Sequence, residues 1–123
     1  MKLSAFNPLI LTENAADTLA LFEELGFEQK HLKSGFDETN TVSHVLENPD
    51  GFHIDIVEVA SMPRDLSAIR LTVDNFDEAY DFLISRGFKN IQGDKATDTG
   101  SSKATLLFSP SGFAVSLAEH YKR

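Results

Sequence analysis

The 123-residue sequence contains no cysteine, and this absence removes several kinds of site at once. Without thiols there is no disulfide framework, no thiolate metal centre and no cysteine nucleophile. The sequence also lacks an apolar stretch long enough to cross a bilayer, because the short run near the N-terminus is broken by Asn7 and Pro8. We therefore expect a cytoplasmic protein with no membrane partner.

Basic residues are also scarce, since 11 Lys and Arg face 19 Asp and Glu and the formal net charge is −8. Binding to a nucleic-acid backbone requires clustered Lys and Arg, so we expect no nucleic-acid partner. The charge mildly favours a neutral or cationic ligand, but the simpler explanation, that it keeps a small protein soluble, carries more weight. No glycine-rich phosphate loop and no spacing typical of a Ser, His and Asp triad is present.

What the sequence does contain is a repeat of itself, without a gap, at an offset of 61 residues. The repeated residues fall mainly at turns and helix ends, where the backbone tolerates few residue types. Leu46, Pro49, Gly51, Phe52 and Glu58 recur as Leu107, Pro110, Gly112, Phe113 and Glu119, and Asn14, Gly26, Phe27 and Asp37 recur as Asn75, Gly87, Phe88 and Asp98. A chain of this length can bury one core, so we predict a single domain over 1–123, made of module one (1–61) and module two (62–123).

Each repeat is predicted to fold as βαβββ. In the first, a strand over 6–11 precedes a helix that the Asn14 side chain caps and Gly26 ends. A polar strand over 28–33, a loop over 34–40 and a hairpin with arms at 41–46 and 52–59 follow. The apolar face of the helix is predicted to comprise Ala15, Leu19, Phe22 and Leu25.

The second repeat follows the same order after a linker over 60–67. A strand over 68–73 leads into a helix with the capping spacing of Asn75 and Glu78, ending at Gly87. A weak strand over 89–92 and a loop over 93–102 precede the hairpin arms at 103–108 and 113–119.

These features resemble the vicinal oxygen chelate superfamily, which includes glyoxalase I, extradiol dioxygenases and bleomycin and fosfomycin resistance proteins. The resemblance covers nearly the whole chain and is carried by the paired modules and by two pairs of motifs. These are the helix ends FEELGF (22–27) and LISRGF (83–88) and the turns NPDG (48–51) and SPSG (109–112). The resemblance implies an α+β fold in which two tandem βαβββ modules form one open, curved mixed sheet with helices outside and a concave cleft inside.

Strand alternation sorts residues between the two faces of such a sheet. Phe52, Ile54 and Ile56 are predicted to face the core, with His53 and Asp55 on the concave side. The same parity places Phe113, Val115 and Leu117 in the core of the second module. The residues expected to face the ligand are Asn7, Leu9, His44, His53, Asp55, Arg70, Thr72 and Ser116.

Enzymes of the superfamily hold a divalent metal with one donor near the start of each module's first strand and a Glu in each last strand. The matching positions here are Asn7, Asp55, Ala68 and Ser116, of which only Asp55 is a good hard ligand. We therefore expect no metal and no other cofactor. A rearranged site made of His44, His53 and Asp55 is the alternative, because two imidazoles and a carboxylate match the ligand set of non-haem iron.

Arg70 is predicted to point into the cleft, where its guanidinium could bind an anionic group of a ligand or pair internally with Asp55. The sequence leaves both possibilities open. The resemblance implies a small-molecule-binding protein of the bleomycin-resistance type, acting as a homodimer. A metal-dependent lyase, isomerase or dioxygenase is the alternative, and a pure interaction module is the third possibility.

Overall fold

The structure is a computed structural model that describes residues 2–36, 41–91, 93, 96–98 and 102–121. The chain folds into two compact units. The first unit is Asn7–Ser67, and the second unit combines Met1–Phe6 with Ala68–Arg123. The first strand therefore belongs to both, with its opening residues in the second unit.

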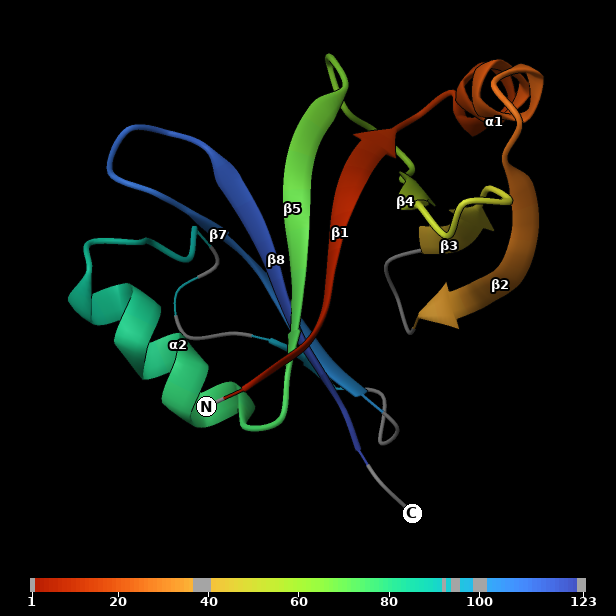
Figure 1. Cartoon of the computed structure of the whole chain (residues 1–123). Helices are drawn as coiled ribbons and strands as arrows, with labels where there is room; N and C mark the ends of the chain where they lie inside the picture. The colour runs from red at the N-terminus through yellow and green to blue at the C-terminus, as the bar shows by residue number, and fades with distance from the viewer. Residues whose placement is uncertain (1, 37–40, 92, 94–95, 99–101, 122–123) are drawn as a thin grey trace. The chain divides into compact units, whose positions relative to one another are not determined.

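The first unit is a βαβββ module. Its elements are β1 (Leu3–Thr12), α1 (Ala15–Glu24), β2 (Glu28–Phe36), β3 (Thr41–Glu47) and β4 (His53–Glu58). The strands lie in the order β2-β3-β4-β1. β1 and β4 are parallel, whereas the other neighbours are antiparallel. Figure 1 shows α1 beside this group of strands.

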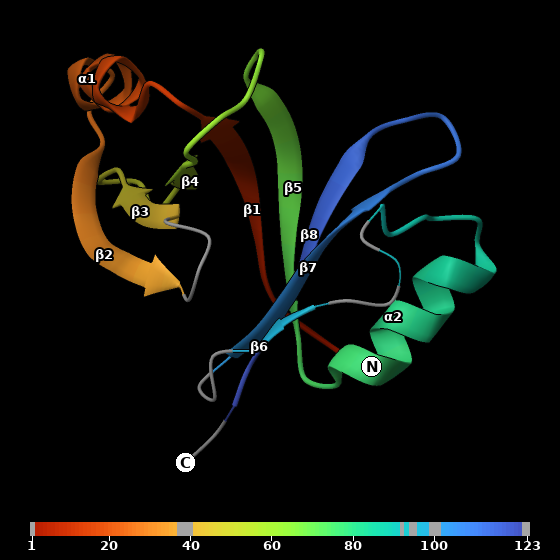
Figure 2. The ribbon, with the colours of Figure 1, turned by 180° about the vertical axis from the view of Figure 1, so that it is seen from behind.

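The second unit repeats the plan. Its elements are β5 (Leu66–Val73), α2 (Phe76–Ser85), β6 (Thr97–Asp98), β7 (Ser102–Phe108) and β8 (Ala114–His120). The order is β5-β8-β7-β6, and β5 and β8 are parallel. Figure 2 shows the β7–β8 hairpin and α2 in the view from behind.

The repeat predicted from the sequence is confirmed for the first strand, the helix and the hairpin strands of each module. Adding 61 to the bounds of α1 and β3 gives the bounds of α2 and β7. The strand register repeats too, since Leu9 pairs with Asp55 in the first unit and Arg70 pairs with Ser116 in the second. The predicted α+β class with paired βαβββ modules is therefore correct.

At the two repeated helix ends the backbone adopts a conformation that glycine accommodates readily. Gly26 and Gly87 adopt φ values of 104° and 95°, in the left-handed region that other residues rarely occupy. At Gly87 the space is also restricted, because an added Cβ would lie 2.8 Å from Pro110 Cγ in the turn between β7 and β8. Helix end and hairpin turn are thus packed together in the second unit.

Each unit has its own apolar cluster between its helix and one face of its strands. In the first unit Leu46, Ile54 and Ile56 pack with Ala15 and with the partly buried Leu19 and Phe22, as the helical spacing predicts. In the second, Leu107 and Leu117 pack with Val73, Phe76 and Ala79.

Three residues predicted to be in the core are exposed instead. Leu25 is 62% exposed, Phe52 66% and Phe113 53%. Leu25 follows the last turn of α1, and the two phenylalanines directly precede β4 and β8, so strand alternation does not yet fix their direction. Phe113 packs edge-on against Phe88 at a ring separation of 5.6 Å.

The two helix N-termini differ. The Asn75 side chain accepts a hydrogen bond from the Glu78 amide at 3.1 Å, which confirms the predicted cap of α2. The predicted cap by Asn14 is wrong, because its side chain makes no capping bond and its Nδ2 donates to Asp17 Oδ2 at 2.8 Å. Asn14 and Asn75 occupy the same position of the repeat, so that position alone did not show that only Asn75 caps its helix.

Two predicted loops are partly ordered into strands. Residues 34–36 continue β2, and Thr97 and Asp98 form the short β6. Residues 37–40, 94–95 and 99–101 of the two loops lie outside the described residues, and Ser102 begins β7. Of the predicted strand over 89–92, the described residues 89–91 form a single bridge, between Lys89 and Phe108, and residue 92 lies outside the described residues.

Among the described residues, no helix has the length and apolar character needed to span a membrane.

Candidate functional site

The first unit places a row of polar side chains on the face of its strands that α1 does not cover. Ile54 and Ile56 of β4 pack toward the helix, so His53 and Asp55, which alternate with them, face the other way. The register places Leu9 of β1 directly beside Asp55 on this helix-free face. The parity predicted for β4 is therefore correct from His53 onward.

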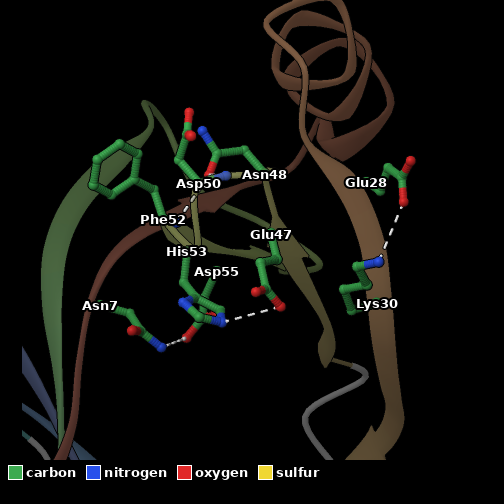
Figure 3. Close-up of polar contacts among 9 residues, drawn as sticks. All are labelled: Asn7, Glu28, Lys30, Glu47, Asn48, Asp50, Phe52, His53 and Asp55. Carbon is green, nitrogen blue, oxygen red and sulfur yellow. Dashed lines mark hydrogen bonds and ion pairs between the residues drawn. The ribbon is translucent and has the colours of Figure 1, made fainter.

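Asp55 is the most deeply buried member of this row, with 1% of its surface exposed. Asn7 Nδ2 donates a hydrogen bond to Asp55 Oδ2 at 3.5 Å, from β1 to β4 (Figure 3). Leu9, which is 2% exposed, flanks the carboxylate on the same strand as Asn7. A buried carboxylate requires polar partners, and the Asn7 amide supplies one of them.

His53 and Glu47 form the accessible end of the row. They are directly opposed on β4 and β3, and His53 Nε2 lies 3.4 Å from Glu47 Oε1 (Figure 3). Their side chains are 41% and 36% exposed, so the contact is solvent-screened and contributes at most about 1 kcal/mol when the imidazole is protonated. Sequence reasoning missed Glu47, although its position just before the NPDG turn, opposite His53, was a usable signal.

The structure corrects the placement of His44. This residue lies opposite Ile56 on β3 and alternates with Ser43 and Val45, which puts it on the face that α1 covers. Its Nδ1 lies 3.1 Å from Gln29 Oε1, while its buried Nε2 has no hydrogen-bond partner among the described residues.

The alternative metal set of His44, His53 and Asp55 is therefore not brought together. His44 is separated from the other two by the sheet itself, because register assigns it to the opposite face. Within the part of the chain that the structure describes, no group of three or more His, Asp or Glu residues could hold a metal ion.

The second unit also has a helix-free face, and the sequence predicted its members correctly. Leu71 and Leu117 pack with the apolar cluster beneath α2, so Arg70, Thr72 and Ser116 face the other way. Arg70 is half-buried and directly opposite Ser116. Thr72 and Ser116 are 6% and 8% exposed.

Elsewhere in the second unit, polar groups have structural roles. Glu119 Oε1 accepts a hydrogen bond from the Phe76 amide at 2.7 Å, which adds a second cap to α2 that the sequence did not suggest. Desolvation and the 2.9 Å hydrogen bond that its hydroxyl donates to Asp98 raise the pKa of Tyr121 above its ordinary value of 10.0.

No family model matches the sequence, and no curated protein matches it. Solved structures do match the fold. A methylmalonyl-CoA epimerase from Mycobacterium tuberculosis superposes with a TM-score of 0.72 at 14% identity, over 98% of this chain and 90% of that one. Glyoxalase I from Zea mays gives 0.69 at 16% identity, over 98% of this chain but 44% of that one. A hypothetical protein from Bacillus halodurans C-125 gives 0.68 at 16%, over 99% and 96%.

The chain has the fold of these solved structures, as the sequence resemblance predicted. At such low identities the likeness establishes the fold and leaves the activity open.

The positions that the sequence resemblance assigns to metal ligands do not suit a metal ion in this chain. In the first unit they are Asn7 and Asp55, and the amide nitrogen of Asn7 is directed at the carboxylate. In the second they are Ala68, which has no donor atom, and Ser116, which has only a neutral hydroxyl. One carboxylate is fewer than the three protein donors that a catalytic zinc site ordinarily has.

Proposed function

We propose that this protein binds a small molecule through the helix-free faces of its strands and does so without a catalytic metal. The observation that carries the proposal is the donor set at the metal positions of the fold. Asp55 alone offers a charged oxygen, it is 1% exposed, and it accepts a hydrogen bond from Asn7. Such a set does not replace the water shell of a divalent cation.

The helix-free faces keep groups that suit binding. His53 and Glu47 remain 41% and 36% exposed at one end of the first face. On the second face Arg70 provides a guanidinium that can contact a carboxylate or phosphate through two donors. Leu9, Thr72 and Ser116 add the apolar and neutral surface typical of small-molecule sites.

A metal-dependent lyase, isomerase or dioxygenase is the second candidate. It is favoured by the solved structures of similar fold, one of which is described as an epimerase and another as glyoxalase I. Such an enzyme would need a metal site other than His44, His53 and Asp55, because His44 lies on the helix-covered face.

The binding proposal is tested by a thermal-shift screen of the metal-free protein against anionic, neutral and cationic small molecules. If an anionic ligand is found, Arg70→Ala should remove most of its stabilisation while leaving the unliganded melting temperature within a few degrees. Lys89→Ala is the matched control, because Lys89 is exposed and its structural contacts are through the backbone. Equal losses in the two variants would show that general charge, and not Arg70, binds the ligand.

We further propose that the protein is cytoplasmic. We also propose that it is a homodimer, since unpaired strand edges favour closed association. Sedimentation velocity over a wide concentration range tests the dimer. A single monomeric species throughout would refute it.

A further inference from the structure

Helix α1 carries two leucines that remain largely in contact with water. Leu21 is 54% exposed, and Leu25, just past the end of the helix, is 62% exposed. The Leu25 amide donates to the Leu21 carbonyl at 3.1 Å, so the two side chains lie one helical turn apart on the same side. The strands lie against the other side of the helix, which carries Ala15, Leu19 and Phe22. We call Leu21 and Leu25 the outer ridge of α1.

The equivalent positions of α2 are partly covered by a cation of the chain itself. At the offset of 61, Leu21 and Leu25 correspond to Phe82 and Arg86. The Arg86 guanidinium lies over the Phe82 ring, 5.0 Å from its centre. In α1 a second leucine stands where α2 has the arginine. The repeated fold therefore does not itself require two exposed apolar side chains at these positions.

Exposed carboxylates flank the outer ridge, and α1 contains no basic residue. Asp17 and Glu24 are the neighbours of Leu21 on the helix surface, because they lie four and three residues from it. Among the described residues, neither of these carboxylates nor that of Glu23 forms an ion pair. Glu23 and Glu24 also lie in the last turn, where the negative end of the helix dipole favours cations.

Several features of α1 are thus unfavourable for the helix on its own. Its first turn lacks a cap from Asn14, its last turn is acidic, and its outer ridge lies in water. Positions where a chain departs from the locally favourable choice are commonly functional sites. The outer ridge and its carboxylates are therefore a candidate interaction surface.

We propose that this surface binds a basic amphipathic helix of another protein. The row formed by Leu21 and Leu25 fits between the side-chain rows of a second helix. Lysines or arginines beside the apolar residues of that helix pair with Asp17, Glu23 and Glu24. The same carboxylates repel a nucleic acid, an anionic membrane and a second copy of this chain, whose net charge is −8.

The size and place of the surface define the kind of interaction. Because α1 has 10 residues, the contact is small, and we expect a Kd in the micromolar range or above. The candidate ligand-binding residues of the first unit lie on the face of the strands that α1 does not cover. Docking on α1 is therefore separate from ligand binding and from any metal.

Selection from a phage-displayed library of random peptides, with the whole chain immobilised, tests this docking surface. The peptides have about 16 residues, enough for about four helical turns. We expect the enriched peptides to carry large apolar residues one helical turn apart, flanked by lysine or arginine. A labelled synthetic copy of the most enriched peptide is then titrated with the chain and its variants by fluorescence anisotropy.

Leu21→Ala and Leu25→Ala should each weaken peptide binding about tenfold. Glu24→Lys should weaken it as well, without lowering the melting temperature, because it removes an acid from the negative end of the helix dipole. Phe82→Ala, at the matched position of α2, is the control and should leave the Kd unchanged.

Enriched peptides that lack basic residues, or that bind both leucine variants as tightly as the wild-type chain, would overturn the proposal. A selection that enriches nothing beyond a parallel selection on the Leu21→Ala, Leu25→Ala double variant would overturn it too. Circular dichroism checks that the variants are folded. If a leucine variant is unfolded, Glu24→Lys decides, and undiminished binding to that variant refutes the docking surface.

Discussion

Leu46 and Leu107 occupy the same position of the repeat, one in each unit, and both are completely buried at 0% exposure. They allow a sharp test of the prediction that the chain is one domain. Replacing a fully buried leucine by alanine removes apolar contacts and leaves a cavity, at a cost of about 2–5 kcal/mol. For a protein of this size the total free energy of unfolding is about 5–15 kcal/mol. Leu46→Ala should therefore lower the urea midpoint by about 1–2.5 M, for an m-value of about 2 kcal/mol per molar.

The distribution of tyrosine makes the assay specific for one unit. The only two tyrosines, Tyr80 and Tyr121, both lie in the second unit, and the chain has no tryptophan. Tyrosine fluorescence therefore reports unfolding of the second unit, whereas far-ultraviolet circular dichroism reports both. If the chain is one cooperative domain, Leu46→Ala in the first unit shifts both signals equally, as does Leu107→Ala. A fluorescence midpoint that stays at the wild-type value while the dichroism transition splits would refute the single-domain prediction.

Two other matched pairs test local explanations by chemical denaturation. Asn75→Ala should cost about 1 kcal/mol because it removes a helix cap, and Asn14→Ala should cost clearly less because that side chain makes no capping bond. Equal costs would contradict the assignment of the caps. Gly87→Ala should cost at least about 1 kcal/mol more than Gly26→Ala, because both have positive φ but only at Gly87 does a new Cβ meet Pro110. A larger cost at Gly26 would show that backbone strain outweighs the contact with the proline.

The repeat explains why so much of the fold could be predicted from the sequence. Turn and helix-end residues such as Gly26, Gly87, Pro49 and Pro110 mark backbone positions that few residue types can occupy, so their spacing fixes the order of the elements. Strand alternation then assigned Asp55 and Arg70 to the correct faces, because a strand with one face against a helix has a period of two.

The errors occur where local pattern and tertiary contact disagree. The alternative metal set combines His44, from the neighbouring arm of the hairpin, with His53 and Asp55, but the face on which His44 lies depends on the register between β3 and β4. Strand alternation was extended to Phe52 and Phe113, although they lie just outside β4 and β8. The roles of the candidate binding residues were not predictable to the same degree, since one fold carries many activities.

The central claim is that this fold operates here without its catalytic metal, and metal analysis of the protein purified without an affinity tag tests it most directly. We expect well under one equivalent of zinc, iron, nickel or manganese per chain, and no change in content on Asp55→Asn. Stoichiometric metal that is lost on Asp55→Asn or on His53→Ala would contradict the account and favour the metal-dependent enzyme.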